Sequence, residues 1–236
     1  MTAKLISYSQ PAPAEYKGFH EKKSNADKDI QELIAYTARV SNPSNQDNTE
    51  TSEKLLRYLI RENHWSPFEM VSACIEVTTT RDIARQLLRH RSFSFQEFSQ
   101  RYADPTQDLN FNFKDARLQD NKNRQNSLEL ADMMDSDQRV DLEFNWLQKQ
   151  AEVVNEAKKS YEWAIENGIA KEQARAVLPE GIMESRLYVN GTIRSWIHYV
   201  GLRTGHGTQK EHIELAQECA QALEPIFPMI KDFTND

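Results

Sequence analysis

Arginine residues crowd into one short stretch of an otherwise acidic chain. Residues 89–102 read RHRSFSFQEFSQRY, whereas the 236-residue chain carries a formal net charge of −7. Guanidinium groups bind phosphate through paired hydrogen bonds and stack on flat rings, and the hydroxyls between them add further donors. The stretch therefore predicts a site for a phosphorylated, planar ligand.

Three further arginines lie at or near the ends of expected elements, where side chains from distant parts of a fold can meet in one cleft. They are Arg175, Arg194 and Arg203. Taken alone, each of these arginines could equally be a surface ion-pair partner. Together with residues 89–102 they favour a small anionic ligand.

The sequence lacks the motifs of several enzyme classes. With seven glycines it contains no Gly-x-Gly-x-x-Gly turn and no P-loop, so a dinucleotide would not bind through a Rossmann domain. His198, His206 and His212 have no carboxylate at metal-ligand spacing, which favours a structural or solvated role over a metal site. Cys74 and Cys219 lie in an expected strand and an expected helix without a nearby base, so cysteine catalysis is not expected.

The composition limits the binding partners and the cellular compartment that we expect. An acidic chain disfavours general nucleic-acid binding, which depends on neutralising many phosphates. Two isolated cysteines indicate neither a disulfide framework nor a zinc site, and suggest a reducing compartment. The first residues lack the apolar run of a signal peptide, and no segment is apolar enough to span a membrane. We expect a soluble, cytoplasmic protein.

Hydrophobic periodicity predicts the elements that position these residues. Alternation predicts strands over 4–8, 71–78 and 183–190, and helical spacing predicts helices over 30–40, 55–60, 81–89, 144–165, 193–200 and 213–223. Residues 10–25, polar and proline-bearing, read as a connection. This order predicts an α+β fold, a single domain over 1–236 with a central, mostly antiparallel sheet flanked by helices.

Arg81, Arg85 and Arg89 are spaced four apart, so they form one cationic helix face, and Thr79 or Thr80 can cap that helix. The stretch 89–102 then begins at the end of this helix and continues as a loop.

A polar excursion and a long helix follow. Residues 103–137 have little periodicity and predict a surface excursion with short helical pieces, for which a merely solvated insertion is the simplest interpretation. The longest helix comes next and ends at Gly168. Its apolar seam comprises Phe144, Leu147, Ala151, Val154, Tyr161 and Ile165. Such a seam can pack against the sheet or against another subunit.

The arginine-rich stretch resembles the signature of the flavin-dependent thymidylate synthases. The fixed positions of that signature are filled by Arg89, His90, Arg91, Ser94, Glu97, Ser99, Arg101 and Tyr102. Segments 38–41, 64–69, 84–86, 175–179, 193–195 and 202–203 resemble the family in the same order. The resemblance covers nearly the whole chain except residues 105–137.

The resemblance implies the reductive methylation of dUMP to dTMP. Methylenetetrahydrofolate would supply the methylene group, and FAD, reduced beforehand by NADPH, would supply the hydride without a cysteine nucleophile. It also implies a homotetramer whose sites are shared between subunits, with no nucleic-acid or membrane partner.

Roles carry over from the family position by position. The implied dUMP contacts are Gln86, Arg89, Glu97, Ser99, Gln100, Arg101, Arg175 and Arg203. Arg175 would reach the phosphate from a neighbouring subunit. Arg203 would be the catalytic residue, because a guanidinium beside the imide of the uracil ring favours negative charge there.

The implied FAD contacts are Ser66, Arg89, His90, Arg91, Glu97, Thr192, Arg194 and His198. His64 would border the flavin where the folate enters. No residue is expected to bind a metal.

The sequence departs from the family pattern after Arg203. Members often show His-Ala-Gln-x-Glu there, whereas residues 206–211 read HGTQKE, which leaves His206 out of register and without an assigned role. The alternatives are a non-catalytic module that binds nucleotides or phosphate with the same arginines and, disfavoured by the charge, an RNA-binding protein.

Overall fold

The computed structural model describes residues 1–12 and 30–235, so residues 13–25 of the predicted connection lie outside the described part. Its main sheet has four strands in the order β1-β2-β6-β3, and all neighbouring pairs are antiparallel. The strands are β1 (Thr2–Tyr8), β2 (Ser72–Thr80), β3 (Ser94–Glu97) and β6 (Glu184–Thr192). The antiparallel sheet expected from the sequence is confirmed.

Alternating side chains give this sheet one buried and one polar face. In the central pair, Ile75 lies opposite Val189 and Val77 opposite Leu187, and all four side chains are fully buried. The residues between them are polar, and Glu76 faces Tyr188. Inward apolar and outward polar positions are what fix the register of a half-buried sheet.

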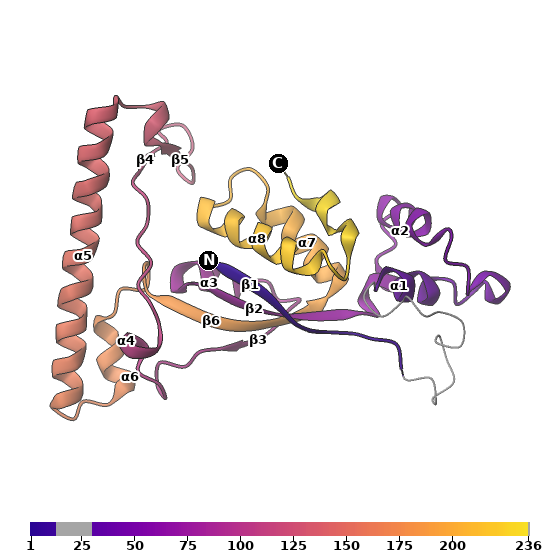
Figure 1. Cartoon of the computed structure of the whole chain (residues 1–236), viewed down its shortest axis with the longest axis horizontal. Coiled ribbons are helices and arrows are strands. Elements are labelled where there is room, and N and C mark those ends of the chain that lie inside the picture. The colour runs from indigo at the N-terminus through magenta and orange to yellow at the C-terminus, as the bar shows by residue number, and fades with distance from the viewer. Residues whose placement is uncertain (13–29, 236) are drawn as a thin grey trace.

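Helices cover the apolar face of the sheet (Figure 1). They include α3 (Arg81–Leu87), α7 (Ile193–Arg203) and α8 (Lys210–Leu223), while α1 (Gln31–Ala38) and α2 (Ser52–Arg61) lie at one end. Trp196 on α7 is fully buried at the centre of the main core, and its indole N–H bonds the carbonyl of Ala73 at 3.1 Å. The helix positions agree with the apolar periodicity.

The prediction that residues 89–102 continue from the helix as a loop is partly wrong. Four of its residues form β3, which pairs with the edge of β6 so that Phe95 lies opposite Val189. Four residues are too few for a period of two to stand out in the sequence, and the strand exists because β6 supplies a partner. Thr80 does occupy the N-cap position of α3, without a side-chain capping bond to the helix backbone.

The polar excursion has more structure than expected. It contains the short helix α4 (Pro105–Asp108) and a hairpin of β4 (Arg117–Gln119) and β5 (Ser127–Glu129). The hairpin stands beside the beginning of α5 (Ser136–Glu166), the long helix at one end of the molecule (Figure 1). The short helical pieces expected there are present as α4 and a 3-10 turn (Leu130–Asp132), whereas the hairpin was not predicted.

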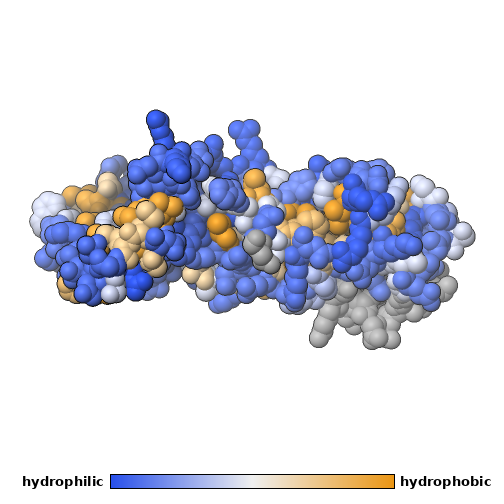
Figure 2. Space-filling model, turned by 90° about the horizontal axis from the view of Figure 1, so that it is seen from above, coloured by the Kyte–Doolittle hydropathy of each residue, from blue (hydrophilic) through white to orange (hydrophobic). Residues whose placement is uncertain are grey.

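The apolar seam of α5 packs along only part of its length. Val154 and Tyr161 are buried against the body, whereas Phe144 is 58% exposed and Leu147 45% exposed. Figure 2 shows hydrophobic side chains gathered on the surface at this end of the molecule. The helix ends before Gly168, whose φ of +76° suits glycine. A short helix α6 (Lys171–Ala174) and a 3-10 turn (Arg175–Val177) then lead back to the sheet.

Within the described ranges, no helix combines the length and the apolar composition that crossing a bilayer requires.

Candidate active site

Two helices begin at opposite ends of the sheet, and the last residue of α7 meets the segment that follows α3. Because β2 and β6 are antiparallel, Thr80, which precedes α3, pairs with Glu184, whereas Thr192, which precedes α7, pairs with Ser72. The Thr192 hydroxyl caps α7 by accepting the amide N–H of Ser195 at 3.2 Å. The helices therefore run toward one another over the sheet.

Arg203 and His90 form the contact where these helices end. Arg203 donates its Nε–H to Nε2 of His90 at 2.9 Å. Since a guanidinium only donates, Nε2 of His90 is the acceptor and the ring carries its proton on Nδ1. Burial, together with the charge of Arg203, lowers the pKa of His90 to about 4. His90 is therefore neutral near pH 7.

Gln86 and His212 lie beside this pair. His212 is fully buried on α8, and its Nδ1 is 3.1 Å from the amide oxygen of Gln86. Burial first, then the charges of Arg203 and His90, lower the pKa of His212 to about 3. The structural role expected for His212 agrees with its burial, but its place beside Gln86 was not foreseen. Only the apolar spacing of α8 signals that it points inward.

The loop after β3 has its own contacts. Ser185 donates to the Glu97 carboxylate at 2.8 Å, and Arg81 lies 3.4 Å from the same oxygen. The Ser99 hydroxyl accepts the backbone N–H of Arg101 at 3.4 Å. Gln100 is buried, with its amide 3.2 Å from the sulfur of Met183. Glu97 is thus held by its own subunit.

A cavity of about 300 Å³ adjoins this loop. Its lining residues are Arg81, Arg85, Gln100, Arg175, Ala176, Leu178 and Glu180. Three guanidinium groups face one carboxylate, and Glu180 pairs with both Arg85 at 2.5 Å and Arg81 at 3.6 Å. Hydrogen bonding from Arg85 is the largest cause that lowers the pKa of Glu180.

Arg175 enters this cavity with a single bond, from its Nε to the carbonyl of Glu172 at 3.2 Å, and no carboxylate partner among the described residues. The cavity keeps an excess of positive charge, which suits a phosphate. The sequence placed Arg81 and Arg85 on a cationic face but gave them no site role. The expected continuous face is not formed, because Arg81 is buried and Arg89 lies beyond the end of α3.

The residues expected to bind FAD fall into two groups. Ser66, Thr192, Arg194 and His198 gather where the 3-10 turn Ser66–Glu69 meets the start of α7. There Arg194 pairs with Glu69, and the His198 ring meets Trp65 edge-on at 4.5 Å between ring centroids. Burial, then Arg194, lowers the pKa of His198. His64 lies nearby in the chain, 6.3 Å from the ring of Tyr58.

The second group follows α3. Arg89 and Arg91 are exposed, and neither has a carboxylate partner in the part of the chain that the structure describes. The segment bridges the two ends of α7, because His90 bonds Arg203 while the carbonyl of Ser92 accepts the Ser195 hydroxyl at 3.3 Å. At a rise of about 1.5 Å per residue, the ends of α7 are roughly 15 Å apart. Glu97 belongs to neither group.

Comparison with known proteins gives a consistent result. Residues 24–229 match the family described as thymidylate synthase complementing protein. The chain is 46% identical over 236 residues to a probable flavin-dependent thymidylate synthase of Paramecium bursaria Chlorella virus 1, with 98% of this chain and 97% of that protein covered. It is 50% identical over 198 residues to the flavin-dependent thymidylate synthase of Synechocystis sp., covering 84% and 86%.

A solved structure agrees in fold. The UMP/dUMP methylase PolB from Streptomyces cacaoi, bound with 5-Br dUMP, superposes with a TM-score of 0.73 at 25% identity over 98% of this chain and 93% of its own. Both the matched length and the identity to curated relatives are decisive. The chain belongs to the thymidylate synthase complementing protein family, the family of the flavin-dependent thymidylate synthases.

Proposed function

We propose that this chain catalyses the reductive methylation of dUMP to dTMP, with methylenetetrahydrofolate as carbon donor and FAD, reduced by NADPH, as hydride source. The observation that carries the proposal is the Arg203–His90 contact beside Gln86 and His212. It places a permanent cation among two imidazoles held neutral, where a pyrimidine ring could be activated.

Arg203 is the activating residue in this proposal. A guanidinium next to the uracil imide stabilises the negative charge that develops on the ring when it attacks the methylene carbon. Because the pKa values of His90 and His212 are lowered to about 4 and about 3, neither ring competes as a cation at neutral pH. The half-buried Arg203 side chain can therefore act in a weakly screened setting.

Phosphate binding is assigned to the cavity lined by Arg175. The cavity holds more guanidinium groups than carboxylates, and of the three arginines that line it Arg175 is the one without a carboxylate partner among the described residues. Arg101, paired with Glu172 at 3.4 Å at the surface, can exchange that partner for phosphate at small cost. The contacts of Glu97, Ser99 and Gln100 hold the segment that leads into Arg101.

The residues expected to bind FAD fit an extended dinucleotide. Arg89 and Arg91 offer two exposed guanidinium groups to a pyrophosphate, and Arg194 and His198 lie within the first six residues of α7. FAD, once bound, supplies the hydride. The chain supplies the anchoring charges, and Ser66 and Thr192 supply hydroxyls.

Neither cysteine suits nucleophilic attack. Burial raises the pKa of the fully buried Cys219 thiol, and burial also raises the pKa of Cys74 on the sheet. A reaction that uses a flavin hydride needs no such nucleophile, so the thiols support the proposed reaction.

We propose in addition a homotetramer with shared sites. Gln86 and the phosphate cavity use different faces of α3, because Arg81 and Arg85 line the cavity while Gln86 turns toward α8. One nucleotide would therefore take the Arg203 group from one copy and the Arg175 group from another. The exposed apolar side chains of α5 would supply contact between copies.

The test is spectroscopic and chemical. The purified protein should be yellow, its flavin absorbance should bleach with NADPH under nitrogen and return in air, and adding dUMP with methylenetetrahydrofolate should yield dTMP. A colourless protein that fails to bind FAD, or one that binds dUMP without turning it over, would identify a non-catalytic nucleotide-binding module instead.

A further inference from the structure

We propose that Arg117, on the excursion hairpin, is a positioning residue that fixes the orientation of the Gln86 amide through Glu211 and Gln209. The inference deepens the proposed function, because it takes from it only that Gln86 reads the uracil ring. It gives the excursion a role that neither the family match nor the sequence assigns to it.

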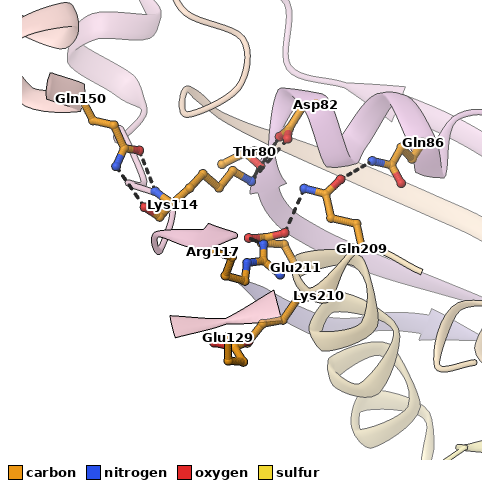
Figure 3. A network of polar contacts seen from close by, with 10 residues as sticks. All are labelled: Thr80, Asp82, Gln86, Lys114, Arg117, Glu129, Gln150, Gln209, Lys210 and Glu211. Carbon is orange, nitrogen blue, oxygen red and sulfur yellow. Dashed lines mark hydrogen bonds and ion pairs between the residues drawn. The ribbon is translucent and has the colours of Figure 1, made fainter. Parts of the chain in front are cut away.

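The contacts form an unbroken chain (Figure 3). The Arg117 guanidinium pairs with the carboxylate of Glu211, and both side chains are 11% exposed. Glu211 accepts the Gln209 amide N–H at 2.9 Å, and Gln209 in turn accepts an N–H of Gln86 at 2.8 Å. The chain ends at His212, whose Nδ1 is 3.1 Å from the Gln86 oxygen.

The ion pair of Arg117 with Glu211 determines the direction of every hydrogen bond in this series. A guanidinium can only donate, and an ionised carboxylate can only accept. Glu211 must therefore receive an N–H from Gln209, which turns the Gln209 oxygen toward Gln86. Gln86 must donate an N–H to the Gln209 oxygen, so the Gln86 oxygen faces His212. His212 must then carry its proton on Nδ1 in order to donate it to Gln86.

The Glu211 carboxylate is ionised at neutral pH. Burial raises the pKa of Glu211, but hydrogen bonds from its own backbone amide, from Arg117 and from Gln209 outweigh it, and the net direction is downward. Glu211 thus stays ionised at neutral pH. Without Arg117 the buried carboxylate would lose its counter-charge, which is strongly unfavourable.

The orientation matters for the ligand. An amide nitrogen carries two hydrogens, and Gln209 takes one of them. The described residues supply no acceptor for the other, so a fixed Gln86 offers a donor. A donor matches a carbonyl oxygen of uracil and opposes the amino group of cytosine. The series of hydrogen bonds that starts at Arg117 should therefore favour the binding of dUMP over that of dCMP.

The hairpin supplies its own matched control. Lys210 on α8 pairs with Glu129 on β5 at 2.9 Å, so it also ties the excursion to α8. This pair is 40% and 48% exposed and has no bond to Gln209 or Gln86. Replacing Lys210 removes a tether between the same two elements without touching the amide chain.

The experiment compares Arg117→Ala, Arg117→Lys and Glu211→Gln with Lys210→Ala in the FAD-loaded protein. Losing one directed hydrogen bond corresponds to about a 5- to 20-fold effect. We expect Arg117→Ala and Glu211→Gln to raise the KM for dUMP by about that factor. The dUMP-over-dCMP preference should fall by a similar factor, with kcat and FAD content changed less. Arg117→Lys, which keeps a donor-only cation, should restore both values.

Melting temperature separates positioning from simple loss of stability. Glu211→Gln keeps side-chain volume and permits both amide directions, so it should lose dUMP-over-dCMP discrimination even if its melting temperature matches that of Lys210→Ala. The proposal is overturned if Arg117→Ala and Glu211→Gln keep the discrimination of Lys210→Ala, or if Arg117→Lys fails to restore it. Equilibrium titration with dUMP and dCMP decides this even if the wild-type protein forms no dTMP, a result that would count against the proposed function alone.

Discussion

Arg203 donates its Nε–H to Nε2 of His90 across 2.9 Å, which ties the last residue of α7 to the segment that follows α3. The bond uses the lone pair that His90 would need in order to take up a proton. It also fixes Arg203 from one side and leaves its terminal nitrogens to a ligand. The charge of the cluster therefore resides on Arg203.

Removing that charge should stop the reaction. Arg203→Ala should lower kcat for dTMP formation by at least about 100-fold, the usual effect of deleting a group that stabilises developing charge. Flavin content and melting temperature should change little, since the side chain is half-buried at a helix end. Arg203→Ala activity within a few-fold of wild type would exclude the activating role.

Arg175 should act on the phosphate alone. Arg175→Ala should raise the KM for dUMP by about 10- to 100-fold, as expected for a charge-assisted bond to phosphate, with a smaller change in kcat. Binding of deoxyuridine, which lacks the phosphate, should be unaffected. Arg61→Ala is the matched control, because Arg61 is an exposed arginine on α2 paired with Glu62. Equal losses for dUMP and deoxyuridine would place Arg175 elsewhere in the site.

Gly191 should be needed to position the segment that carries Arg89 and Arg91. A Cβ at this position of β6 would come within 2.2 Å of the Phe93 ring, whose centroid lies 4.5 Å from that of the tilted Trp196 ring. Gly191→Ala should therefore displace the segment that carries Arg89 and Arg91, destabilise the protein by about 1–3 kcal/mol and weaken FAD binding. Gly181→Ala, with open space around its Cβ, should do neither. Normal FAD affinity in Gly191→Ala would show that the segment is positioned independently of this packing.

His212 should make stability depend on pH. Its pKa is about 3 in the folded chain, against an ordinary value of 6.5. Between these two pH values the unfolded chain binds a proton at His212 and the folded chain does not. Stability is therefore full above pH 6.5 and falls as the pH drops toward 3, by an amount on the order of a few kcal/mol. His90, with a pKa of about 4, adds in the same direction.

Thermal unfolding at pH 7.5 and pH 5 in His212→Asn checks this. Asparagine can still donate to Gln86 but does not titrate, so the drop in melting temperature between the two pH values should shrink. Leu215→Ala, a buried neighbour on α8, should cost about 2–5 kcal/mol at both pH values and keep the wild-type drop. An unchanged drop in His212→Asn would mean that other groups carry the pH dependence.

The sequence predicted the elements that have a strong period and missed those that depend on a partner. Alternation in residues 71–78 and 183–190 gave β2 and β6 to within two residues at each end. The strand β3 and the β4–β5 hairpin were missed because each strand is only three or four residues long and exists through its neighbour. The apolar seam of α5 was identified, but its exposed first half could not be distinguished from a buried one.

Residue types identified the ligand chemistry, but not the connections between site residues. Dense arginines pointed to an anionic ligand, and the structure places Arg175 in a cationic cavity with Arg81 and Arg85, which lie about 90 residues earlier in the sequence. The chain from Arg117 to Gln86 joins residues from the excursion, α8 and α3. No local pattern encodes such a path, since each bond is a long-range consequence of the fold. The individual ligand roles remain predictions.

The folate product tests the central claim most directly. Converting a transferred methylene into a methyl group takes two electrons. If FAD supplies them, the folate must leave as tetrahydrofolate, and if the folate itself supplies them, it must leave as dihydrofolate. We predict one tetrahydrofolate and one oxidised NADPH per dTMP, measured by chromatography of a complete reaction. Dihydrofolate formed in equal amount with dTMP, without NADPH oxidation, would contradict the account.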